Sequence, residues 1–144
     1  ADVPVVMVSI NTNAAPATLL EIGRRLRPLR EEGVLIVASG NVVHNLRLTD
    51  WKNPNGVAWA DAFDKTVRDA VIGGDKKSGG DFDTAANFLD LEDADLAVPT
   101  PEHYQPLIVA LGAARTSDKV TVFNDYRELG SMSMTSYLFE AADN

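Results

Sequence analysis

The sequence contains no cysteine, which excludes disulfide bonds, thiolate zinc sites and cysteine nucleophiles. Basic residues are also few, because 13 Lys and Arg stand against 21 Asp and Glu, and the formal net charge is −8. This balance argues against a general nucleic-acid-binding role, since phosphate backbones are bound by an excess of Lys and Arg. Long apolar runs are missing too, and residues 34–38 are far shorter than the roughly 20 residues that span a membrane. We therefore expect no nucleic-acid or membrane partner, and the lack of cysteine is compatible with a cytoplasmic location.

The first third of the chain predicts an α/β fold. Residues 3–10 and 34–38 are short apolar segments rich in Val and Ile, which is typical of strands buried on both faces of a parallel sheet. Between them, apolar residues recur at helical spacing, and we expect Asn13 to cap this helix and Gly33 to end it. Strand, helix and strand form a βαβ unit. The prediction is one domain over residues 1–144, without internal boundary, in which helices flank a mostly parallel or mixed sheet.

A strand as the first element needs neighbours, so we expect this chain to begin inside a larger sheet. The later expected elements are helices over residues 57–72, 82–89 and 100–111 and strands over residues 119–124 and 132–139. Thr100 is expected to cap the third of these helices, and Pro106 to kink it. The glycine-rich residues 73–80 lack the order of a phosphate-binding loop and are predicted to form a flexible surface connection.

Two histidines are the main candidates for chemistry. His44 follows the second predicted strand, and in open α/β sheets ligands bind outside the carboxyl ends of strands. Gly40 and Asn41 can turn the chain there through left-handed conformations. His103 falls in the first turn of its predicted helix, where the helix dipole favours the neutral ring that binds metals. Either histidine can equally have a structural role, and two ligands do not complete a metal site, because three or four are normal.

Four segments in this order resemble one enzyme family. They are Ser39-Gly-Asn-Val-Val-His-Asn-Leu-Arg47, Trp59-Ala-x-x-Phe63, Val98-Pro-Thr-Pro-Glu-His-Tyr-x-Pro-Leu107 and Gly130-Ser-Met-Ser-Met134. The chain resembles, through nearly all of its length, the C-terminal half of the 4,5-DOPA dioxygenase extradiol family, part of the class III extradiol ring-cleavage dioxygenases. The resemblance implies a class III extradiol dioxygenase-like fold whose N-terminal half, with two further metal-site histidines, lies outside this chain.

The resemblance also implies an activity, namely insertion of both atoms of O2 beside the hydroxyls of a catechol at non-haem Fe(II) or Zn(II). By motif, His44 and His103 both belong at this metal centre. We expect His103 to complete the metal ligation, in the place where relatives have a carboxylate, and His44 to act as acid and base beside the metal. Exchanged roles, or two ligating rings, remain open.

Four further residues are candidates for substrate binding. Asn41, Asn45 and Tyr104 could orient a ring hydroxyl, and Arg47 could bind a substrate carboxylate through two hydrogen bonds. Each also has a structural interpretation: a turn former, a helix cap, a packed aromatic ring and a surface ion-pair partner, respectively. Residues 133–134 are expected to support the site from behind.

Two other functions remain as alternatives: a non-catalytic scaffold or binding relative of the same fold, and a hydrolase that uses zinc hydroxide. The favoured hypothesis is the dioxygenase, with a catechol-type substrate, O2 and the N-terminal half of the same protein as partners. We expect the chain alone to be inactive, and the sequence leaves open whether it forms oligomers. The hypothesis requires the imidazoles of residues 44 and 103 to lie together.

Overall fold

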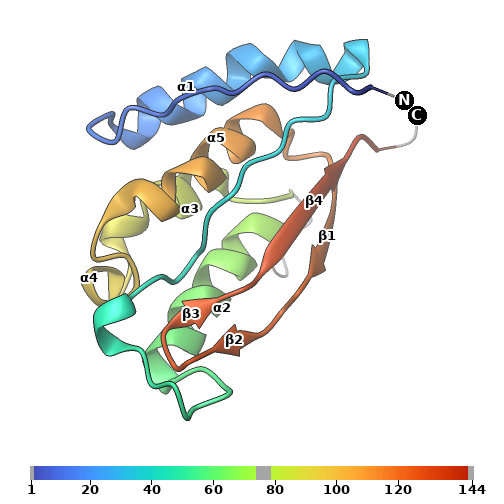
Figure 1. Cartoon of the computed structure of the whole chain (residues 1–144). Helices are drawn as coiled ribbons and strands as arrows, with labels where there is room; N and C mark the ends of the chain where they lie inside the picture. Colours follow the sequence, from blue (N-terminus) through green and yellow to red (C-terminus); the bar gives the residue numbers. More distant parts are fainter. Residues whose placement is uncertain (1, 74–78, 143–144) are drawn as a thin grey trace.

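The computed structural model describes residues 2–73 and 79–142. The α-helices are α1 (Pro16–Leu26), α2 (Ala58–Ile72), α3 (Phe82–Ala86), α4 (Ala94–Ala97) and α5 (Gln105–Ala113) (Figure 1). Short 3-10 helices are η1 (Arg27–Glu32), η2 (Leu46–Leu48), η3 (Phe88–Asp90) and η4 (Pro101–His103). The strands are β1 (Lys119–Phe123), β2 (Arg127–Glu128), β3 (Met132–Ser133) and β4 (Ser136–Glu140). Across the described ranges, no helix is long and apolar enough to cross a membrane.

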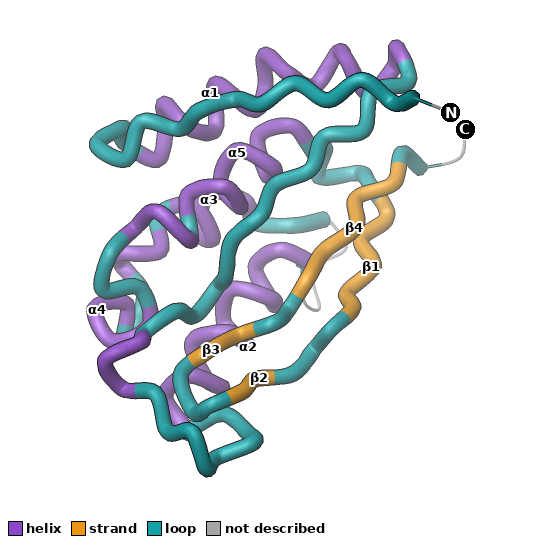
Figure 2. Tube along the Cα trace, viewed as in Figure 1, coloured by secondary structure: helices purple, strands orange, loops and turns teal. Residues whose placement is uncertain are grey.

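The strands form one long antiparallel ribbon near the end of the chain. β1 pairs with β4, with Val120 opposite Phe139, and β2 pairs with β3, with Glu128 opposite Met132. In the view of Figure 2 the chain runs down one side of this ribbon through β1 and β2 and returns up the other through β3 and β4. The two late strands are therefore confirmed, with the second one interrupted between β3 and β4.

The α/β class is confirmed, but the strands predicted over residues 3–10 and 34–38 do not form. Within the described ranges, residues 2–10 and 35–40 make no backbone-to-backbone hydrogen bond, so the expected parallel pair is absent there. Their apolar side chains face solvent, with Met7 93% and Val37 77% exposed. The apolar pattern predicted strands here, but a strand needs a neighbouring backbone to pair with, and neither segment has one within the described ranges.

Helix boundaries differ from the prediction in two places. Ala15 occupies the N-cap position of α1, so Asn13 does not cap it, whereas Gly33 does end the helical stretch in a left-handed conformation. The single helix expected over residues 100–111 is divided into η4 and α5. Pro106 lies in the first turn of α5, where the missing N–H costs no hydrogen bond, so it begins a helix instead of kinking one.

Two shorter predictions complete the comparison. The helix expected over residues 82–89 is present as α3 followed by η3. Thr100 precedes η4 without a capping hydrogen bond, because its hydroxyl donates to Glu102 Oε1 at 2.7 Å. Of the predicted connection over residues 73–80, residues 74–78 lie outside the described part.

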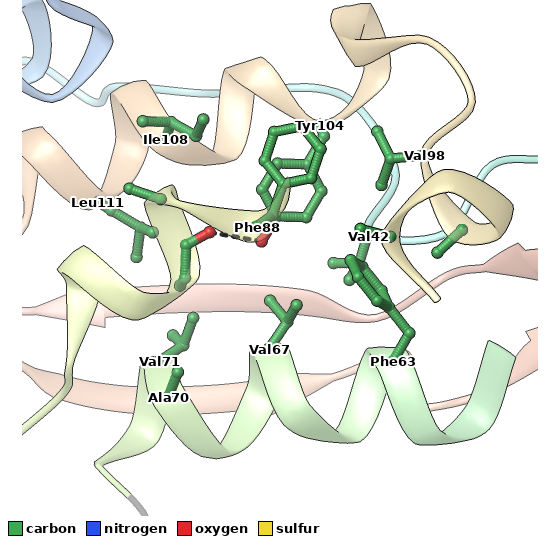
Figure 3. Packing of buried hydrophobic residues seen from close by; sticks show 14 of the residues in the cluster. Val42, Phe63, Val67, Ala70, Val71, Phe88, Val98, Tyr104, Ile108 and Leu111 are labelled. Carbon is green, nitrogen blue, oxygen red and sulfur yellow. Dashed lines mark hydrogen bonds between the residues drawn. The ribbon is translucent and has the colours of Figure 1, made fainter. Parts of the chain in front are cut away.

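The core lies between α2, α5 and the aromatic residues around α3. Phe63, Val67 and Val71 project from one face of α2 toward Ile108 of α5 and its neighbours (Figure 3). Burial of each such side chain contributes on the order of 1.5–3 kcal/mol relative to exposure.

Helices α1 and α5 cross at two glycines. A Cβ built on Gly23 would overlap the carbonyl oxygen of Val109, and one built on Gly112 would overlap that of Leu20. The helix backbones are therefore in direct contact, which fixes the position of α5 and of the η4 turn that precedes it.

Replacing Gly112 with alanine should destabilise the protein, because the new methyl group has no space in this crossing. We expect Gly112→Ala to lower the free energy of unfolding by about 1–3 kcal/mol, measured by urea denaturation. Thr18→Ala, on the exposed side of α1, is the matched control and should change it by less than about 0.5 kcal/mol. Equal stability of Gly112→Ala and the unmodified chain would contradict the close crossing.

Candidate functional site

The two histidine rings lie against each other. The ring centroids of His44 and His103 are 3.8 Å apart and the ring planes are inclined by 11°, so the imidazoles are stacked. Both side chains are half-buried and come from segments far apart in the sequence. This is the juxtaposition that the dioxygenase hypothesis requires.

Backbone hydrogen bonds hold the two histidine-bearing segments together. The N–H of His44 donates to the carbonyl of Ala97 at 2.9 Å, and the N–H of Asn41 donates to the carbonyl of His103 at 2.9 Å. Gly40 lies so close that a Cβ there would overlap the same His103 carbonyl oxygen. Neither Gly40 nor Asn41 has a positive φ, so the predicted left-handed turn is wrong. The glycine is needed for close approach instead.

Strand β3 supports this segment from behind. The N–H of Ser133 donates to the carbonyl of Val43 at 2.9 Å, and Asn41 Nδ2 donates to the carbonyl of Ser133 at 2.7 Å. The N–H of Asn45 donates to the carbonyl of Ser131 at 3.1 Å. Ser133 therefore occupies the supporting position that the sequence predicted.

A buried carboxylate on α2 anchors β3. Asp64 accepts hydrogen bonds from the hydroxyls of Ser133 and Thr135 and pairs with Arg127 Nη1 at 3.0 Å. Burial raises the pKa of Asp64, although the two hydroxyl bonds and the Arg127 charge act in the opposite direction. Asp64 is not among the residues that the sequence indicated. The spacing Ala60, Asp64, Val67 places it on the buried stripe and was the available signal.

The electrostatic surroundings favour a neutral His44. Burial lowers its pKa, the nearby His103 lowers it further, and the Glu102 carboxylate partly opposes both. The hydrogen bond from Thr100 lowers the pKa of Glu102, which keeps that carboxylate ionised. A neutral imidazole has a free nitrogen lone pair, so His44 can accept a proton or a metal ion.

His103 is the last residue of η4, and α5 begins only at Gln105. The predicted position in the first turn of the long helix is therefore wrong, and the helix-dipole argument does not apply to it. Its side chain is held by the stack with His44 and by the backbone contact with Asn41.

The residues predicted to bind substrate differ in their burial and in their hydrogen-bond partners. Asn41 is half-buried beside the histidines, with its Nδ2 bound to Ser133. Asn45 is buried, and its carboxamide donates to the Leu96 carbonyl at 2.8 Å and accepts from the Arg47 N–H at 3.0 Å. It thus caps η2, which is the structural interpretation. Arg47 is exposed on that short helix.

The placement of Tyr104 argues against the substrate contact predicted for it. The residue is fully buried, its hydroxyl donates to the Ala85 carbonyl at 2.7 Å, and its ring contacts Phe88 at a centroid distance of 4.3 Å (Figure 3). Consecutive residues in a helical turn point about 100° apart. A half-exposed His103 is therefore compatible with a Tyr104 that faces the core.

The side chains at this site supply some, but not all, of the ligands that a metal ion needs. In the described part of the chain, no group of three or more His, Asp or Glu side chains could hold a metal, and the two imidazoles are the candidate ligands there. An imidazole binds a metal in the plane of its ring, and planes inclined by only 11° do not meet at bonding distance from both rings. The geometry therefore suits one ligating ring with the other alongside.

The family model and the curated proteins that match this chain are both described as dioxygenases. Residues 1–140 match the family model described as the catalytic LigB subunit of aromatic ring-opening dioxygenase. The chain is 39% identical over 137 residues to the 4,5-DOPA dioxygenase extradiol of Escherichia coli (strain K12), covering 94% of this chain and 49% of that protein. It is 34% identical over 140 residues to the protein of the same name from Beta vulgaris, covering 96% and 50%.

A solved structure agrees with this result. The crystal structure of an uncharacterized Escherichia coli K12 protein has a TM-score of 0.78 and 38% identity, covering 90% of this chain and 52% of that one. The chain thus spans about half the length of the curated relatives and of the solved structure that it matches.

Gly40→Ala should separate the histidine rings. The added methyl group would displace the His103 carbonyl and break the hydrogen bond from Asn41. We expect loss of nuclear Overhauser contacts between the two imidazoles and a stability loss of about 1–3 kcal/mol. Ser39→Ala, at an exposed neighbouring position, should preserve both. Retention of the ring contacts in Gly40→Ala would refute the proposed packing.

The buried Asp64 should make stability depend on pH. Its pKa is raised on folding, so the folded chain binds the proton more tightly, and the free energy of unfolding falls as pH rises from about 4 through the raised pKa. The free energy of unfolding is measured by denaturation at a series of pH values. In Asp64→Asn, the part of its fall with rising pH that comes from this carboxyl should be absent. In Thr135→Val, which removes a hydrogen bond that lowers the pKa, the decline should extend to higher pH. An opposite slope in the difference between the unmodified chain and Asp64→Asn would show that this carboxyl is not penalised by burial.

Proposed function

This chain belongs to the LigB family of aromatic ring-opening dioxygenases, and we propose that it supplies half of an extradiol ring-cleavage site. The substrate is a catechol-type molecule, the second substrate is O2, and the remaining metal ligands come from polypeptide corresponding to the half of its relatives that this chain does not match. The stacked pair of His44 and His103 is the observation that carries the proposal, because it gathers two imidazoles in one half-buried place.

His103 is the metal ligand in this proposal, and the metal is Fe(II) or Zn(II). When bound, either ion would lower the pKa of a coordinated hydroxyl, and Fe(II), with an open coordination position, would also support reaction with O2, whereas Zn(II) has no redox chemistry. The near-parallel planes of the two rings favour one ligating imidazole, which leaves the other free for proton transfer.

His44 is the acid and base. Its lowered pKa keeps the ring neutral, so its unprotonated nitrogen can take a proton from a catechol hydroxyl and later return it. The stack on His103 and the hydrogen bond from its own N–H to Ala97 fix its position.

Asn41 and Arg47 remain the candidates for substrate orientation. The Asn41 carboxamide oxygen is an acceptor for a ring hydroxyl, while its Nδ2 stays bound to Ser133. The exposed Arg47 can pair with a carboxylate on the substrate. Asn45 and Tyr104 have no part in this proposal, since their polar groups already serve the fold.

The activity test requires both halves. The probe is this chain co-expressed with the half of the Escherichia coli 4,5-DOPA dioxygenase extradiol that it does not match, supplied with Fe(II) and a catechol under air. We expect a yellow ring-opened product from the two halves together and none from this chain alone. Zinc-dependent ester hydrolysis would support the hydrolase alternative, and an inert complex with a full metal content would support the scaffold.

Substitution of each histidine should have a different effect. His103→Ala should lower the bound metal per complex, since it removes a ligand. His44→Gln should retain the metal and reduce turnover by about 10²–10⁴-fold, the usual contribution of acid and base catalysis. Metal content is measured by elemental analysis and turnover by O2 uptake, with the exposed Trp51→Ala as the control for both. Loss of metal in His44→Gln, with retention in His103→Ala, would reverse the two roles.

A further inference from the structure

A groove opens above the histidine pair, where two extended segments diverge. Residues 41–45 pair with residues 131–133, through the hydrogen bonds of Asn45 to Ser131 and of Ser133 to Val43. Beyond this joint, residues 34–40 run away from β4, and the two can be followed as separate tubes in Figure 2. The space between them has a volume of about 600 Å³, and Leu107 and Ala110 of α5 also line it.

Two extended segments line this groove. Residues 34–38 line one side, Ser136–Phe139 of β4 line the other, and β4 already pairs with β1 along its opposite edge. Between described residues, the backbone of residues 35–40 makes no backbone hydrogen bond. Extended backbone with free N–H and C=O groups is the template that strand addition uses.

Several of the side chains that line the groove are apolar and accessible. Leu35 and Val37 are each 77% exposed, and Phe123 and Leu138 on the ribbon are also exposed. Such a concentration of exposed apolar side chains marks an interaction site. An occupant must therefore bring apolar side chains as well as backbone hydrogen bonds.

The two ends of the groove are formed by polar residues. At one end, Arg30 donates to the carbonyls of Ala113 at 2.9 Å and Phe139 at 3.2 Å and pairs with Asp118 at 2.7 Å. At the other end lie Asn41 and His103. An extended occupant would therefore have one end beside the histidine pair.

We propose that this groove is the docking site for one extended, apolar segment of the polypeptide that corresponds to the unmatched half of the relatives. The identity of that polypeptide rests on the proposed function, and its existence in the relatives follows from the chain covering 49–52% of their length. The segment adds a strand between residues 34–38 and β4. The end of this segment that lies beside Asn41 and His103 reaches the histidine pair, where the metal site needs further ligands.

Hydrogen–deuterium exchange tests the docking without metal or substrate. The probe is the unmatched half of the Escherichia coli relative, co-expressed with this chain and purified with it through a tag. We expect at least tenfold slower amide exchange in residues 35–39 and in β4 in the complex than in the chain alone. Because neither metal nor turnover is measured, docking can succeed where the activity test fails, and the two failures remain distinguishable.

Matched variants locate the contact. Val37→Lys places a charge in the groove and should abolish co-purification, whereas Leu89→Lys, at a similarly exposed position outside the groove, should preserve it. Equal thermal unfolding of the two variants shows that the chain remains folded.

Four outcomes would overturn the proposal. They are a complex without protection in residues 35–39, no complex at all, protection by a catechol alone, and protection of the isolated chain that increases with its concentration. The third would identify a small-molecule pocket, and the fourth would identify a second copy of this chain as the occupant.

Discussion

The joint between residues 41–45 and 131–133 is the constraint on which the candidate site depends. It fastens the segment that carries His44 to the ribbon, and Asn41 extends the same set of hydrogen bonds to His103. Asp64 secures the joint from inside the core through Ser133. The histidines are therefore positioned by backbone bonds and by a buried carboxylate, which leaves both rings half-exposed for chemistry.

The motifs around positions 44 and 103 predicted that the two imidazoles lie together, and the structure places the rings in contact. The chemical roles of the two histidines stay a prediction. The polar groups of Asn45 and Tyr104 are used by the fold, and only the coordinates show that they bind the carbonyls of Leu96 and Ala85. The sequence predicted the helix that is α2 but gave Asp64 no distinct role.

The predicted strands over residues 3–10 and 34–38 show a different limit. Their composition is typical of strands that are buried in a sheet, and composition is a property of each segment alone. Pairing is a property of two segments, and neither segment finds a partner within the described ranges. The late ribbon succeeds because β1 and β4 each supply the other's hydrogen bonds. An apolar run alone therefore does not predict a strand, because it says nothing of the backbone that must pair with it.

The long sequence separations across the joint have a consequence for biosynthesis. Asn41 and Ser133 are 92 positions apart, and Arg30 and Phe139 are 109 apart. Contacts of such long range form late, because the intervening loop must first be closed. During translation, α1 and α2 can therefore leave the ribosome well before the ribbon, but the histidine pair lacks the support of β3 until residues 131–133 have emerged. A chain that stalls before Ser133 would have both imidazoles and the hydrogen bond between Asn41 and His103, but not the strand that supports them from behind.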